Sequence, residues 1–156
     1  MKFLSILMTF LLIPMMANAE GSIHIKDAFI YETKASMPAA AGFMTVMNHG
    51  DTDDKFIDFK TDIAARTELH TMTHENEIMK MRKVDGYVVK GDDGVVTLEP
   101  TGNHIMFFGL TKDLVAGDEI KATAIFEKAG EVPVTIPVQS RGQKKMMNHG
   151  GNHHHY

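Results

Sequence analysis

The fold is decided by residues 68–110, which read ELHTMTHENEIMKMRKVDGYVVKGDDGVVTLEPTGNHIMFFGL. Short apolar or alternating runs are separated here by turn signals such as Asp85-Gly86 and the Gly-Asp-Asp-Gly sequence at 91–94. Short strands with a turn every eight to twelve residues or so are typical of a β-sandwich or barrel. We predict the strands of this stretch at 68–73, 77–84, 86–90, 94–98 and 103–110.

The same pattern continues on both sides of this stretch. Residues 62–68 interrupt it, and we predict one helical turn there, but no segment shows sustained helical periodicity with caps. The fold class is therefore all-β, in a single domain of residues 20–139. The remaining strands are predicted at 22–30, 42–47, 55–60, 119–127 and 131–138.

The N-terminal end has the features of a secretory signal peptide. A positive start at residues 1–2 precedes an almost purely apolar run at 3–16, and Ala17-Asn18-Ala19 gives a small-x-small cleavage pattern. We predict a signal peptide at residues 1–19 and a mature protein in the periplasm. The apolar run is shorter than the ~20 residues of a membrane-spanning helix, and no later stretch could span a membrane.

Composition excludes several classes of function. The 156 residues contain no cysteine, and the formal net charge is −4. Without a thiolate the chain has no thiol nucleophile, no iron–sulfur cluster and no blue-copper site, and no cysteine follows the apolar run to carry a lipid. A mildly acidic chain gives no electrostatic basis for nucleic-acid binding. Since no nucleophile–base pair or Gly-rich phosphate loop is apparent, we predict a binding protein and not an enzyme.

Methionine and histidine are unusually frequent, with 13 and 9 residues. Three short patterns hold two of these side chains at positions i and i+2, which point to the same face of a strand. Each pattern therefore presents a pair of possible metal ligands. Thioether and imidazole donors together favour Cu(I) over Zn(II), Mg(II) or Ca(II). The three patterns are His70-Thr71-Met72, Met79-Lys80-Met81 and His104-Ile105-Met106.

These residues also have simpler interpretations. A methionine on a strand usually fills the core, and a lone histidine is more often solvated or hydrogen-bonded than bound to a metal. Three donor pairs in one short domain favour a metal site, with His70 and His104 as joint ligands. Met72 and Met79 are weaker candidates that could pack or act as accessory donors.

Residues 140–156 form a predicted flexible tail that is rich in Gly, Lys, Asn and His. Imidazole nitrogens favour Cu(II) in the affinity order of divalent metals. We predict that the tail captures Cu(II) or donates extra ligands to the Cu(I) site; a solubilising tail and an engineered remnant are the alternatives. Its candidate ligands are Met146, Met147, His149, His153, His154 and His155.

The donors follow one another at a specific spacing. Ten residues separate His70 from Met81, and 22 separate Met81 from His104-Ile105-Met106. This order resembles the motif of the periplasmic copper chaperones of the PCu(A)C family, which has about 21 residues in the second interval. The resemblance extends over residues 24–138, and the extra residue falls near the turn at 91–94. It is also carried by Asp27-Ala28-Phe29, Ala40-Ala41-Gly42-Phe43-Met44, Glu68-Leu69-His70-Thr71-Met72, Met79-Lys80-Met81-Arg82, Gly109-Leu110 and Phe126-Glu127-Lys128-Ala129-Gly130.

The resemblance implies a cupredoxin-like Greek-key β-fold and a Cu(I) site of His70, Met81, His104 and Met106. It also implies delivery of copper for assembly of the Cu(A) site of cytochrome c oxidase, to an oxidase subunit or to another copper chaperone. Because a chaperone must release its metal to a partner, we expect the site to be exposed. A copper storage or resistance protein with no oxidase partner remains the alternative.

Overall fold

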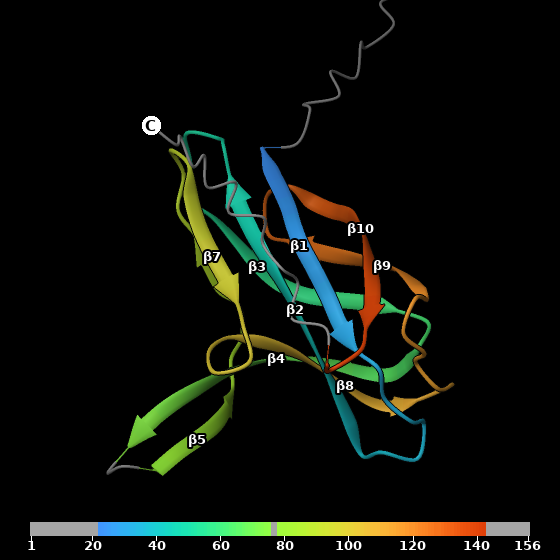
Figure 1. Ribbon diagram of the computed structural model, residues 1–156. Helices are drawn as coiled ribbons and strands as arrows, with labels where there is room; N and C mark the ends of the chain where they lie inside the picture. The colour runs from blue at the N-terminus through green and yellow to red at the C-terminus, as the bar shows by residue number, and fades with distance from the viewer. Residues whose placement is uncertain (1–21, 76–77, 143–156) are drawn as a thin grey trace, which may run out of the picture.

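The computed structural model describes residues 22–75 and 78–142. These residues form ten strands and no helix (Figure 1), so the predicted all-β fold class is confirmed. The predicted signal peptide and residues 143–156 of the predicted tail lie outside the described residues. The strands are β1 (Ile23–Tyr31), β2 (Ala39–Asn48), β3 (Asp54–Thr61), β4 (Ala64–Glu75), β5 (Ile78–Lys83), β6 (Tyr87–Val89), β7 (Gly94–Leu98), β8 (His104–Leu110), β9 (Glu119–Phe126) and β10 (Gly130–Gln139).

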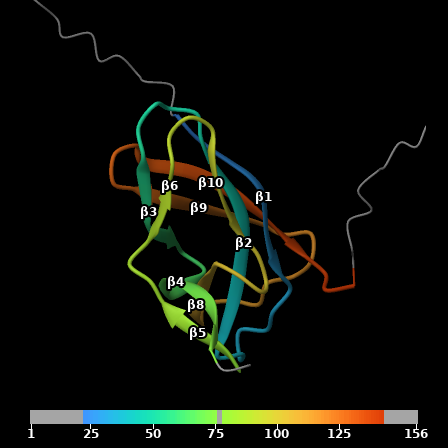
Figure 2. The same cartoon turned by 90° about the vertical axis from the view of Figure 1, so that its left-hand side faces the viewer.

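The strands pair in the order β5-β4-β8-β2-β1-β10-β9-β3-β6, and β7 pairs with the second half of β2. Only the β1–β10 pairing is parallel, and the other pairings among the described strands are antiparallel. The sheet folds over so that its two halves face each other. Figures 1 and 2 both place β4, β5 and β8 together at the lower end of the molecule.

The core lies between the two halves and takes alternate residues of each strand, as the period-two pattern predicts. In β8, Ile105 and Phe107 are fully buried, whereas Met106 between them is not. The Phe107 ring packs edge-on against Phe59 of β3, with ring centroids 5.9 Å apart. One face of β8 therefore belongs to the core, and its other face is left for His104 and Met106.

The predicted helical turn at residues 62–68 is wrong. β4 begins at Ala64, which pairs with Leu110, and the pairing with β8 continues to His70. A helical turn would leave this part of β8 without hydrogen-bonding partners on the side away from β2, so tertiary pairing overrides the helical propensity of the two alanines. Within the described residues, no helix is long and apolar enough to cross a membrane.

Candidate metal centre

The register of three strands brings the predicted ligands to one face. His70 of β4 lies directly opposite His104 of β8. Met81 of β5 pairs with Met72, two residues along β4 from His70. Since residues that pair across strands point to the same side, as do residues i and i+2, all of these side chains share a face. The three donor patterns are therefore assembled in one place.

Two histidines form the centre of this face. The ring centroids of His70 and His104 are 5.9 Å apart, and the rings are inclined by 42°. Both residues are buried, with exposed fractions of 9% and 3%. Ile105 and Leu69 on the opposite face of the same strands pack in the core, so the backbone that carries both histidines is held firmly.

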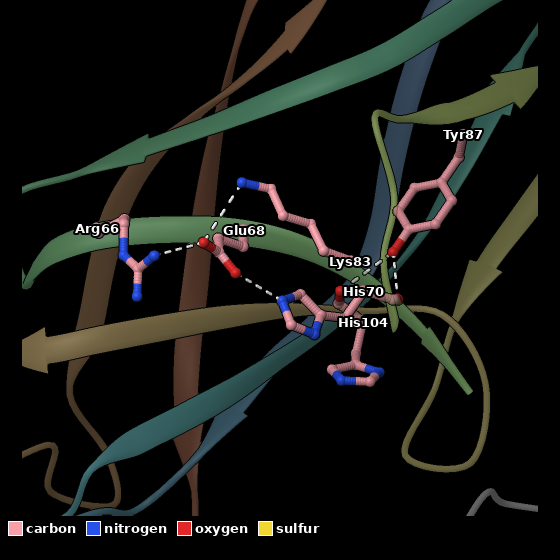
Figure 3. Close-up of polar contacts among 6 residues, drawn as sticks. All are labelled: Arg66, Glu68, His70, Lys83, Tyr87 and His104. Carbon is pink, nitrogen blue, oxygen red and sulfur yellow. Dashed lines mark hydrogen bonds and ion pairs between the residues drawn. The ribbon is translucent and has the colours of Figure 1, made fainter. Parts of the chain in front are cut away.

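A carboxylate orients the first histidine. The Nε2 atom of His70 lies 2.8 Å from Oε2 of Glu68, as Figure 3 shows. The hydrogen bond from His70 lowers the pKa of the Glu68 carboxyl, and so do Lys83 and Arg66, against an opposing effect of burial. Because an ionised carboxylate can only accept, His70 donates from Nε2, and in the neutral ring the lone pair is on Nδ1.

The Nδ1 atom of His70 has no hydrogen-bond partner within the described residues, although it is buried. Such an atom costs free energy unless something binds it, and buried unsatisfied polar atoms are uncommon in folded proteins. The arrangement therefore presents one free imidazole nitrogen toward the donor face.

A backbone carbonyl orients the second histidine. The Nδ1 atom of His104 lies 3.0 Å from the carbonyl oxygen of Gly102, which also accepts the backbone N–H of Met72 at 3.3 Å. Since a carbonyl oxygen only accepts, His104 donates from Nδ1 and has the lone pair on Nε2. Each histidine thus has one nitrogen fixed by the protein and the other available to a ligand, as is usual for metal-binding histidines.

Tyr87 joins the two strands from the opposite layer. Its hydroxyl lies 2.5 Å from the carbonyl oxygen of His70 and 3.1 Å from that of His104 (Figure 3). Burial raises the pKa of Tyr87 to about 12, although these hydrogen bonds oppose the shift. The hydroxyl therefore remains a donor at neutral pH and ties the backbone of both histidines together.

The two methionines flank the histidines on opposite sides. Met106 of β8 pairs with Glu68, and Met81 of β5 lies two residues from Lys83, which pairs with His70. Each methionine is thus diagonal to His70, at about 7–8 Å, which long side chains can span. Met106 is partly buried, whereas Met81 is 49% exposed. The expectation of an exposed site is therefore right for Met81 and wrong for the two histidines.

The accessory candidates are placed less uniformly. Met72 shares the donor face and is partly buried. Met79 lies farther along β5, opposite His74, and is 45% exposed. The candidate ligands of the tail, Met146, Met147, His149, His153, His154 and His155, lie outside the described residues.

Glu68 and Tyr87 are also parts of the site, although we did not predict either of them from the sequence. Glu68 had a signal, because it precedes His70 by two residues and so shares its face. Tyr87 had none, because it is 17 residues from each histidine and reaches them across the core.

The described residues contain no group of three or more His, Cys, Asp or Glu side chains that could hold a metal ion. Within that part of the chain, further ligands for an ion at the histidine pair would therefore be donors of other types. The thioethers of Met81 and Met106 are donors that the register places close to this pair.

Comparison with known families decides where the chain belongs. Residues 23–138 match the family described as "Putative lipoprotein LpqE-like". The chain belongs to the LpqE-like family. The matched range begins at the first residue of β1 and ends one residue before the end of β10, so it covers the whole donor face.

Two relatives of this LpqE-like chain have similar sequences. The protein named "Putative lipoprotein Lxx21020" from Leifsonia xyli is 27% identical over 122 residues, which cover 78% of this chain and 72% of the relative. The protein named "Uncharacterized protein RP573" from Rickettsia prowazekii is 25% identical over 124 residues, or 77% of this chain and 68% of the relative.

Solved structures show the same fold. The apo PCuAC domain of PmoF2 superposes with a TM-score of 0.65 at 24% identity, over 79% of this chain and 94% of that domain. Its copper-bound form gives 0.63 at 24% identity, over 77% and 94%. The Cu(I) form of DR1885 from Deinococcus radiodurans gives 0.58 at 24% identity, over 81% and 85%. The resemblance to the PCu(A)C family is thereby confirmed for the fold, and this LpqE-like chain has the cupredoxin-like fold of PCuAC domains.

Proposed function

We propose that this LpqE-like protein is a periplasmic copper chaperone that binds Cu(I) through His70, Met81, His104 and Met106. The observation that carries the proposal is the facing histidine pair. Each ring is oriented by a hydrogen bond through one nitrogen, and the other nitrogen remains available to a metal ion.

The donor set suits the proposed cargo. Two neutral imidazoles and two thioethers are soft or borderline ligands, which favour Cu(I) over hard divalent ions. The solved structures that carry copper support this choice, because one is copper-bound and another is a Cu(I) form. The unpartnered Nδ1 atom of His70 also fits, since coordination would satisfy it.

The uneven burial of the four ligands suits a carrier more than a catalyst. The histidines are enclosed, which would hold the ion away from solvent, whereas Met81 is half exposed and can exchange first with a partner's ligand. Four protein donors would leave no open position for a substrate. We therefore propose a protein that holds and passes copper and does not catalyse a reaction.

The destination follows from the family resemblance alone. We propose a copper-accepting protein as the partner, either a cytochrome c oxidase subunit that receives copper for its Cu(A) site or another copper chaperone. The name of one relative as a putative lipoprotein supports export, and the apolar N-terminal run supports a periplasmic location. The alternative is copper storage or resistance without an oxidase partner. The proposed role of the tail, Cu(II) capture or extra Cu(I) ligands, is secondary to the site.

A competition titration tests the proposal. The chain of residues 20–156, with Cu(I) supplied under anaerobic conditions, is competed against a Cu(I) chelator and compared with a variant that carries His70→Ala, Met81→Leu, His104→Ala and Met106→Leu. We expect one tightly bound Cu(I) that the variant loses. Equal affinity in both proteins would refute the site. Parallel titrations of chains that end at residue 142 separate any contribution of the tail.

A further inference from the structure

The donor face continues past the proposed site along an exposed arm. β4 and β5 pair from His70 and Lys83 outward to Glu75 and Ile78, and this hairpin projects from the sandwich (Figure 1). β5 is an edge strand, and all of its side chains are exposed. The outer part of the face is therefore open to a partner.

A second pair of donors lies on this arm. His74 and Met79 pair directly across the hairpin, and the Nδ1 atom of His74 is 3.0 Å from the sulfur of Met79. Met79 does not fill the core, because it is 45% exposed. The contact instead brings a borderline and a soft donor atom together in solvent, the combination that favours Cu(I).

The donors form successive rows on the same face. The His74/Met79 pair is followed inward by the Met72/Met81 pair and then by His70. Rows two residues apart on a strand are separated by about 7 Å. The flexible side chain of Met81 can therefore reach toward an ion at the outer row. The face thus leads inward from the exposed Met79 to the buried His70.

We propose that His74 and Met79 form a second, weaker Cu(I) position at the outer end of the β4–β5 hairpin, through which copper enters and leaves the inner site. The proposal rests on the proposed function of the inner site. The outer position has two protein ligands where the inner one has four, so it binds more weakly and leaves room for a partner's ligand. Copper is then exchanged one ligand at a time, with Met81 as the intermediate donor.

Methionine methyl signals test the proposal residue by residue. The chain of residues 20–156, labelled with 13C in its methionine methyl groups, is titrated anaerobically with Cu(I) and followed by NMR. We expect the Met81 and Met106 signals to move during the first bound equivalent and the Met79 signal to move at higher ratios. The His74→Ala variant should lose the Met79 shift. The Met37→Leu variant is the matched control, because Met37 is a methionine of similar exposure on another part of the surface.

The outcomes separate the outer position from the inner one. A Met79 signal that never moves, or one that moves together with Met81 and Met106 in the first equivalent, overturns the second position. A Met79 shift that persists in His74→Ala also overturns it. If the Met79 signal moves and the Met81 and Met106 signals do not, the proposed inner site is refuted, and the hairpin cannot be its entrance.

Discussion

At the scale of single residues, Glu68 is important for the orientation of His70, although it is not itself a proposed copper ligand. It lies among three basic groups, with Arg66 Nη1 at 2.6 Å, His70 Nε2 at 2.8 Å and Lys83 Nζ at 3.4 Å. Its side chain is only 10% exposed, so these contacts are partly shielded from water. The charge of Glu68 selects the His70 tautomer that leaves Nδ1 free, and Lys83 and Arg66 keep that charge in place.

Removal of this carboxylate should weaken copper binding without touching a proposed ligand. For Glu68→Ala we expect the Cu(I) affinity to fall by about 10–100-fold, the usual effect of losing a partner of a metal-binding histidine. Glu68→Gln should lose less, because its amide oxygen still accepts from Nε2. Chelator competition measures both affinities, and 15N NMR of His70 reports the tautomer.

The control for this prediction is Glu131→Ala. Glu131 also forms an ion pair, with Lys60 at 3.0 Å, but it is exposed and on another strand. Its loss should leave copper binding unchanged. Parental affinity in Glu68→Ala would show that the carboxylate does not position His70.

At the scale of elements, the pairing of β2 with β8 holds the donor face against the core. Gly42 of β2 pairs with Ile105, which lies between His104 and Met106 in β8. A Cβ atom at position 42 would lie 2.7 Å from Cε2 of the buried Phe107 ring. Gly42 does not have a positive φ, so its backbone conformation does not require glycine. The requirement comes from the close packing of the Phe107 ring.

Replacement of this glycine should destabilise the fold. We expect Gly42→Ala to lower the free energy of unfolding by about 1–3 kcal/mol, the usual cost of overpacking a core. Urea denaturation measures the difference. Gly142→Ala is the matched control, because a Cβ atom added at position 142 would have nothing within 4 Å. A Gly42→Ala variant as stable as its parent would mean that Phe107 moves aside freely.

The strands also show which features of the fold can be predicted from sequence patterns. The strands could be predicted from short runs of apolar or alternating residues between turn signals, which are local features, as in Ile105 and Phe107 on one face of β8 and Met106 on the other. The start of β4 could not be predicted in this way, because Ala64 is part of a strand only through its pairing with Leu110, which is far along the chain. Alternation placed the donors of each strand on one face, but the facing of His70 and His104 depends on strand register, which the pattern alone leaves open.

At the scale of the whole molecule, the site joins the two layers of the sandwich. His70 and His104 lie in the β4–β8 layer, and Tyr87 reaches their carbonyl oxygens from β6, which pairs with β3 in the opposite layer. The buried part of the site is therefore anchored through the core, whereas its outer part lies on an exposed hairpin. A firm inner end and an accessible outer end are what retention and transfer of one ion require.

The proposed ligand set is tested most directly by X-ray absorption at the copper edge of the one-to-one Cu(I) complex of residues 20–142, the chain without its histidine-rich end. We expect a first shell with both nitrogen and sulfur neighbours. We also expect the sulfur contribution to be lost when Met81 and Met106 are both replaced by leucine. A shell of nitrogen and oxygen alone, or a sulfur signal that survives the double replacement, would contradict the assignment of His70, Met81, His104 and Met106 as the copper ligands.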